Sequence, residues 1–361
     1  MKAEIKFFVW TCLFLFATQP PKSQAMNVHI SGTPTWEHQS VELLLNWQAE
    51  GVWSFEIWKS TSILDTEWER LDEIQSVGTQ KNHSYTLHVS QNQSPSYYKV
   101  IPKSHPLNGI DEIDLGGGIS MGLARIPAGS FIMGAPETSG LGTSVQPLTS
   151  VMLSKPFLMG KHEITQRQWH KIMGYNPSND IGENRPVETV VWWAADAFCR
   201  VLTERARRNG SIPSNYRVTL PTEAQWEYAC RAGTQTSFYF GEDPMESMLQ
   251  DHAWYLDSAP PGPWNKGTQP VGMLMPNPWG LFDMHGNVAE FCLDSLGTYP
   301  GGHVVDPMGS LNGFRQTFRG GQIFAHHNFC QSAVRGGFAP GQIASHAVGF
   351  RIVVTENDEQ Q

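Results

Sequence analysis

Residues 217–233 read RVTLPTEAQWEYACRAG, and this stretch contains the signals for both ends of a helix. Thr222 is followed three residues later by Gln225, the spacing of a capping box in which each side chain satisfies an amide at a helix start. Glu223 lies in the first turn, where the helix dipole favours a negative charge. Gly233 lets the chain turn without a Cβ penalty. The stretch therefore predicts a helix that begins after Thr222 and ends near Gly233.

Two further helices are expected before this one. KHEITQRQWHKIMG, at residues 161–174, has Thr165 and Gln168 at the same capping-box spacing and ends in a glycine. VVWWAADAFCRVLTERARRNG, at residues 190–210, predicts an amphipathic helix that closes with arginines and a glycine. Because the chain has 34 glycines and 24 prolines, the part that follows the third helix is expected to be mostly loops and short strands.

The composition is that of a globular protein, with 40% hydrophobic and 16% charged residues. The formal net charge of −9 speaks against a nucleic-acid partner, because a phosphate backbone attracts basic surfaces. A length of 361 residues allows one small and one larger domain.

Residues 1–25 have the pattern of a secretory signal peptide. Lys2 and Lys6 precede an apolar run at residues 7–17, and small residues up to Ala25 offer a cleavage site. A membrane anchor is the alternative, but this run is too short for a bilayer core of about 30 Å. The sequence therefore predicts an exported protein, periplasmic, in the cell envelope or secreted, without a transmembrane segment.

Cleavage of the signal would remove Cys12 and leave an even number of cysteines, which suits disulfides in an exported protein. Three pairings of four cysteines are possible, and four buried free thiols are the alternative. The four cysteines are Cys199, Cys230, Cys292 and Cys330.

Residues 27–103 contain short runs rich in aromatic and β-branched residues, which predict a small β-sandwich. The runs are ELLLNWQA from Glu42, VWSFEIWKS from Val52, SYTLHVS from Ser84 and SYYKVI from Ser96. This part resembles the fibronectin type III-like modules of exported bacterial proteins, and we assign no active site to it. A linker is expected at residues 104–120, ending in three glycines, before a second domain at 121–354 and an acidic tail at 355–361.

Several long motifs of the second domain follow one another in a specific order. They are IPAGSFIMG, KHEITQRQW, RPVETVVWWAADAFC, RVTLPTEAQWEYACRAG, PVGMLMPNPWGLFDMHGNVAEF, FRGGQIF, CQSAVR and GFRIV. In these motifs the domain resembles the sulfatase-modifying factor family, which includes formylglycine-generating enzymes. The resemblance implies an α+β, loop-rich fold of the C-type lectin-like kind. It also implies oxidation of a cysteine of an exported protein or peptide substrate to formylglycine.

The copper site that the resemblance implies is incomplete in this sequence. Formylglycine-generating enzymes bind copper through two cysteines near RGG, and Ala325 and Cys330 stand at the corresponding positions. Soft thiolates suit copper(I), and one thiol does not make a two-thiolate site. Cys330 is therefore the catalytic candidate, and Gln322, His326 and His327 are expected beside the pocket.

Two further positions depart from the family pattern. Ala289 stands where the common GNVWEW motif has a tryptophan, and Gln322 stands where a serine usually follows RGG. Two functions stay open, an oxidative enzyme and a non-catalytic ligand- or protein-binding accessory protein. An iron-dependent sulfoxide synthase, which shares this domain, is disfavoured because it needs a further helical domain.

The resemblance also implies a calcium ion at the loop GLFDMHGNVAEF. The family's ligands map onto the side chains of Asp283 and Glu290 and the carbonyl groups of Gly286 and Val288. Calcium takes six to eight hard oxygen ligands at flexible geometry, which such a loop can supply. The alternative is that the two carboxylates only accept hydrogen bonds from loop amides.

Overall fold

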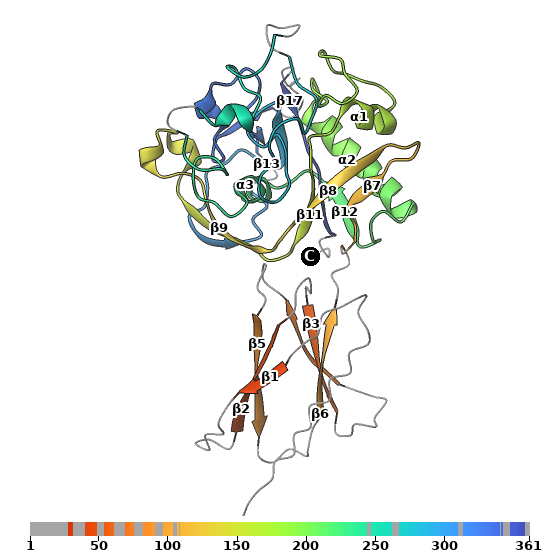
Figure 1. The fold of residues 1–361 in the computed structure, drawn as a ribbon, viewed down its shortest axis with the longest axis vertical. Helices are drawn as coiled ribbons and strands as arrows, with labels where there is room; N and C mark the ends of the chain where they lie inside the picture. The colour runs from red at the N-terminus through yellow and green to blue at the C-terminus, as the bar shows by residue number, and fades with distance from the viewer. Residues whose placement is uncertain are drawn as a thin grey trace, which may run out of the picture. The chain divides into compact units, whose positions relative to one another are not determined.

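The computed structural model divides the chain into two units, residues 1–108 and 109–361 (Figure 1). The described residues are six strands within 28–103, residue 107, and residues 109–357 apart from 244–246, 262–266, 310–312, 340 and 342–346. The expected signal peptide and the last four residues of the acidic tail, 358–361, lie outside this part. No helix among the described residues is long and apolar enough to cross a bilayer.

The first unit contains two three-stranded antiparallel sheets. One has the order β1 (Val28–Ser31), β2 (Ser40–Gln48), β5 (Asn82–Ser90), and the other β4 (Glu69–Gln75), β3 (Ser54–Ser60), β6 (Tyr97–Lys103). Strands β2, β3, β5 and β6 coincide with the four runs from which strands were expected. The side chains of this unit are not described, so its likeness to fibronectin type III modules stays a prediction.

The described residues of the second unit form three small sheets and three α-helices, which is the predicted α+β class. The first sheet has the strand order β14 (Gly302–Val305), β10 (Thr149–Leu153), β9 (Gly129–Met133). The second has the order β12 (Tyr216–Thr219), β18 (Val353–Glu356), β11 (Phe157–Gly160), β8 (Ser120–Ile126), β7 (Glu112–Asp114). The third has the order β16 (Arg335–Phe338), β15 (Gln316–Arg319), β13 (Ala289–Ser295), β17 (Val348–Gly349). Neighbouring strands are antiparallel except β10 with β14 and β13 with β17. Four 3-10 turns accompany them: η1 (Glu137–Ser139), η2 (Thr143–Val145), η3 (Leu249–Asp251) and η4 (His327–Cys330).

The linker is shorter than the sequence suggested, because residues 109–120 belong to the second unit. Strand β7 pairs with β8, and Ile113 and Leu115 are fully buried. The three glycines expected to mark the boundary, Gly116 to Gly118, have positive φ angles and form the turn between these strands. Their freedom of backbone conformation therefore serves a tight hairpin.

The three helices begin and end close to the expected residues. Helix α1 (Gln166–Met173) has the capping box of Thr165 and ends at Gly174, and α2 spans Trp192–Arg208. Helix α3 (Glu223–Arg231) has the capping box of Thr222, but Ala232, one residue before Gly233, takes the left-handed conformation at its end. These local signals are strong because each satisfies backbone groups that a helix end leaves unpaired.

Helix α3 lies among the sheets of the second unit, whereas α1 and α2 lie together on one side (Figure 1). Its Trp226 and Cys230 are fully buried, and they pack with Phe131 of β9 and Val151 of β10 in the main core. A smaller aromatic core joins α1 to α2, where Trp169 stacks on Phe198 at 5.5 Å between ring centroids. Helix α3 also packs against β13 and β15, two of the strands from which the candidate site is built.

Candidate functional site

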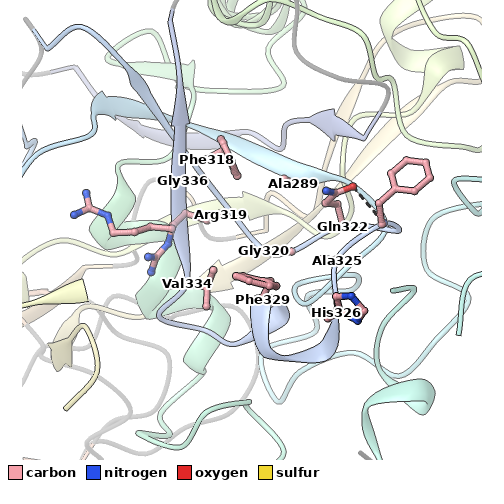
Figure 2. A pocket seen from close by; sticks show the side chains of 13 residues that line it. Ala289, Phe318, Arg319, Gly320, Gln322, Ala325, His326, Phe329, Val334 and Gly336 are labelled. Carbon is pink, nitrogen blue, oxygen red and sulfur yellow. Dashed lines mark hydrogen bonds between the residues drawn. The ribbon is translucent and has the colours of Figure 1, made fainter. Parts of the chain in front are cut away.

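A pocket of about 320 Å³ lies beside the turn that follows strand β15 (Figure 2). In this view Phe318, Val334 and Phe329 lie on one side and Gln322, Ala325 and His326 on the other. The remaining lining residues are Ala289, Arg319, Gly320, Gly321, Phe324, Arg335 and Gly336.

The turn owes its shape to two glycines at the end of β15. Gly320 and Gly321 have φ angles of 100° and 69°, which L side chains rarely adopt. A Cβ on Gly321 would lie 2.8 Å from Cys330 Sγ, so the turn and η4 are in close contact. The side-chain carbonyl of Gln322 accepts a hydrogen bond from the amide of Phe324 at 3.3 Å (Figure 2). This bond leaves the amide nitrogen of Gln322 available to a ligand.

The wall of the pocket is mainly apolar. Phe318, Phe324 and Val334 are half-buried, Ala289 and Ala325 are buried, and Phe329 is 59% exposed. Four polar side chains line the pocket, and two of them, Gln322 and the exposed His326, form no ion pair with a described residue. Such a wall suits an apolar group of a ligand, with a few hydrogen bonds to orient it.

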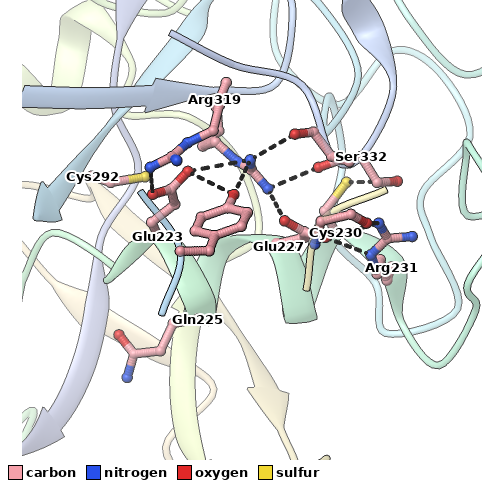
Figure 3. Close-up of polar contacts among 12 residues, drawn as sticks. Glu223, Gln225, Glu227, Cys230, Arg231, Cys292, Arg319 and Ser332 are labelled. Atoms are coloured by element: carbon pink, nitrogen blue, oxygen red, sulfur yellow. Dashed lines mark hydrogen bonds and ion pairs between the residues drawn. The ribbon is translucent and has the colours of Figure 1, made fainter. Parts of the chain in front are cut away.

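The two arginines of the pocket are bound to internal carboxylates, and Figure 3 shows the contacts of Arg319. Arg319, which is fully buried, lies between Glu223 at 3.3 Å and Glu227, and it also donates to the carbonyl groups of Ala333 and Ser332. The Arg335 guanidinium contacts Glu223 at 2.5 Å. Neither arginine therefore offers a free charge to a ligand.

A buried carboxylate cluster lies at the loop of Asp283. The carboxylate of Asp283 accepts a hydrogen bond from the amide of Gly272 through Oδ2 at 2.8 Å, while its Oδ1 is buried without a partner. Glu290 binds Arg351 through both oxygens at 2.6 Å and accepts a bond from Trp226 Nε1 at 2.7 Å. Oε1 of Glu290 accepts one of these bonds, so one of its lone pairs is left.

Glu163, which was not predicted from the sequence, completes this cluster. It is buried and accepts bonds from Asn287 Nδ2 at 2.9 Å and from the amide of Val288 at 3.0 Å. Burial and the neighbouring carboxylates raise the pKa of Glu163, and burial raises the pKa of Asp283 to about 6. Glu163, Asp283 and Glu290 thus share one arginine, Arg351, as their nearby positive charge, and Oδ1 of Asp283 accepts no hydrogen bond from a described residue.

The family model of the sulfatase-modifying factor enzyme 1-like domain matches residues 120–356. The chain belongs to this family. A formylglycine-generating enzyme of Thermomonospora curvata is 26% identical over 310 residues, which cover 71% of this chain and 98% of that protein. A chaperone protein of Paenibacillus barcinonensis, LppX, is 34% identical over 175 residues, or 38% of this chain, and the chain spans 61% of that protein.

A solved structure of the family fold agrees with this assignment. Treponema denticola variable protein 1 superposes with a TM-score of 0.58 and 27% sequence identity. The match covers 67% of this chain and 97% of that one, so it extends over most of the sulfatase-modifying factor domain.

The pocket contains some of the residues expected from the family resemblance. Gln322 and His326 line it, whereas His327 and Cys330 do not. Cys330 is fully buried, its Sγ lies 3.8 Å from the carbonyl oxygen of His326, and burial raises its thiol pKa to about 12. A thiol that stays protonated and has no access to the pocket is a poor nucleophile.

A copper ion held by two thiolates does not fit the residues of this family member. Ala325 and Cys330, which the family resemblance assigns to the two thiolate positions, pack in one apolar cluster with Phe238, Leu249 and Tyr255, so these two positions offer one thiol. Among the described residues, no three His, Cys, Asp or Glu side chains are grouped to hold a metal ion.

The four cysteines of the domain are free and buried, so the disulfides expected from the even count are not formed in this structure. Burial raises the pKa of Cys199 and Cys292 well above the usual value and that of Cys230 to about 12. The alternative of four buried thiols is the arrangement that the structure has.

We expect these four thiols to resist alkylation until the domain unfolds. Iodoacetamide should leave them unmodified in the native protein and modify all four in guanidinium chloride, because reaction requires an accessible thiolate. Peptide mapping by mass spectrometry without reduction would detect this. Recovery of disulfide-linked peptides, or rapid labelling of the native protein, would contradict the prediction.

Proposed function

We propose that this member of the sulfatase-modifying factor family is an exported binding protein on a C-type lectin-like scaffold. Its pocket beside Gly320 and Gly321 receives an apolar side chain of a protein or peptide partner. The observation that carries the proposal is the pocket wall itself, in which Ala325 presents a methyl group and Cys330 is shielded from the ligand.

The two relatives named above suggest different functions, binding and oxidation. The Paenibacillus barcinonensis relative is named a chaperone protein, which suits binding of polypeptide segments. The Thermomonospora curvata relative is named a formylglycine-generating enzyme, which makes copper-dependent oxidation of a sulfatase cysteine the alternative. The missing second thiol favours binding over oxidation, because none of the described residues that line the pocket is a cysteine.

The space at Ala289 provides a test of the binding function. Ala289 is buried on β13 and lines the pocket, so Ala289→Trp should fill it with a large side chain. We expect a short blocked peptide with one central phenylalanine to bind the wild type about tenfold more tightly than the same peptide with alanine, since a buried aromatic ring contributes more than 1.4 kcal/mol. Isothermal titration calorimetry should show that the variant loses this difference.

A matched variant controls for the added tryptophan. Gln250→Trp adds the same side chain at an exposed position outside the pocket and should keep the preference for phenylalanine. Equal affinities of the two peptides for the wild type, or a preserved preference in Ala289→Trp, would refute the proposed binding mode.

We also propose that calcium binds at the carboxylate loop. Asp283 and Glu290 would contribute side-chain oxygens, and Gly286 and Val288 would contribute carbonyl oxygens, as the family resemblance implies. The unpaired, buried Oδ1 of Asp283 supports this proposal. The ion would neutralise the excess carboxylate charge and stabilise the loop that leads into β13.

Calcium should therefore raise the thermal midpoint of protein first stripped with EGTA. At a concentration of about 100 Kd, a ligand that binds only the native state adds about 2.7 kcal/mol of stability. Differential scanning fluorimetry measures the shift of the midpoint. The variant Asp283→Asn should show no shift, whereas the exposed control Asp257→Asn should show the same shift as the wild type. An unchanged midpoint in stripped wild-type protein would remove the assignment.

A further inference from the structure

A second cavity of about 330 Å³ extends from the surface of the domain to a buried carboxyl group. Its rim is formed by exposed residues, and its apolar walls come from three strands of one sheet. The rim residues are Gly297, Thr298, Pro300, Met308 and Gly309, and the wall residues are Met133 of β9, Val151 of β10 and Val304 of β14. The floor contains Asp294, Glu223 and Tyr299.

One carboxylate oxygen of Asp294 accepts a hydrogen bond, and the other accepts none from a described residue. Oδ1 accepts the amide of Glu223 at 2.6 Å, so it caps the start of helix α3. No described residue forms a hydrogen bond or ion pair with Oδ2, although Asp294 is only 4% exposed. A Cβ on Gly309 would lie 2.6 Å from Oδ2, so the glycine keeps this oxygen open.

The charged side chains near Asp294 form ion pairs with one another. Glu223 accepts bonds from Tyr299 at 3.2 Å and from Arg319 at 3.3 Å, and Arg335 contacts its other oxygen (Figure 3 labels Glu223 and Arg319). Arg335 also donates to two backbone carbonyl groups. Burial and the charge of Glu223 raise the pKa of Asp294 and outweigh the lowering by backbone amides and Arg335, so a bound cation would stabilise its charged form.

We infer that this cavity binds a primary alkylammonium group. The ammonium donates to Oδ2 of Asp294, and the alkyl chain lies against Met133, Val151 and Val304. A charge-assisted hydrogen bond to a desolvated carboxylate is strong, and the apolar walls add the free energy of burying methylene groups. The ligand is either a free amine or the lysine side chain of a partner protein, because both present this chemistry.

This site is separate from the pocket of the proposed function. Arg335 lines both cavities, but Asp294 and the three wall residues line only the second. The two proposals therefore succeed or fail independently.

The test uses n-hexylamine as the probe and 1-hexanol as a neutral molecule of the same length. We expect calorimetry on the full chain to show that hexylamine binds at least tenfold more tightly than hexanol. Asp294→Asn should remove this preference, because an amide can still cap helix α3 through its oxygen but carries no charge. Glu112→Gln, which removes a charge from an exposed residue of β7, should leave the preference unchanged.

Nα-acetyl-lysine methylamide distinguishes the two sources of the ammonium. Binding of this compound as well as hexylamine indicates a lysine side chain, and binding of hexylamine alone indicates a free amine; both support the inference. Equal binding of hexanol and hexylamine, no binding of either, or full binding of hexylamine by a folded Asp294→Asn variant would overturn it.

Discussion

Arg319→Met should lower the free energy of unfolding by about 3–5 kcal/mol, the cost of breaking a buried ion pair by removing one partner. Arg319 is fully buried and binds Glu223 and Glu227, whose side chains are 4% and 0% exposed. The substitution leaves the two carboxylates with less positive charge and also removes donors from the carbonyl groups of Ala333 and Ser332. Methionine keeps most of the side-chain volume, so a cavity is not the cause of the loss.

Urea unfolding followed by tryptophan fluorescence measures this effect. Arg200→Met is the matched control, because Arg200 pairs with Asp196 on the surface of α2 and is 71% exposed. An exposed pair of this kind contributes about 0.3–0.5 kcal/mol. If the two variants lose the same free energy, the buried network of Figure 3 does not stabilise the domain.

Gly321→Ala should cost about 2–5 kcal/mol, because it combines a left-handed backbone with overpacking. Gly321 has a φ angle of 69°, and an added Cβ would lie 2.8 Å from Cys330 Sγ, 2.9 Å from Cys330 Cα and 3.1 Å from the carbonyl oxygen of His285. Two of these three atoms belong to the backbone and cannot rotate away. The substitution should therefore displace η4 and open the pocket wall at Ala325.

Gly174→Ala separates the two causes. Gly174 has a φ angle of 80° at the end of α1, and an added Cβ would meet no atom within 4 Å. Its cost should stay near the about 1–2 kcal/mol of the left-handed conformation alone. Thermal unfolding of both variants compares them, and equal losses would mean that the turn and η4 do not pack as described.

The helices could be predicted from the sequence because their signals are local. The capping boxes at Thr165 and Thr222 each lie within four residues of chain, and both are present. The short strand β7 escaped prediction because its pairing with β8 depends on a hairpin of glycines that also suits a linker. Composition alone does not distinguish a flexible glycine run from a turn with positive φ angles.

The candidate site could be predicted in part. A pocket lies beside the RGG motif, and Gln322 and His326 line it, but their part in binding a ligand stays a prediction. Cys330 is only four residues from His326 in sequence, but η4 places its side chain in the core and not in the pocket. Glu163 and Asp294 were missed because their partners are distant in sequence: Glu163 binds the amide of Val288, 125 residues away, and Asp294 binds that of Glu223, 71 residues away.

The oxidase reaction itself tests whether this protein is a binding protein or an enzyme. The purified full chain, supplied with cuprous ion and oxygen, is incubated with a peptide that carries the sulfatase cysteine motif, and mass spectrometry follows conversion of its cysteine to formylglycine. We expect an unmodified peptide and no stoichiometric copper on the protein, because Ala325 supplies no second thiolate. Formation of formylglycine over several turnovers would contradict this expectation.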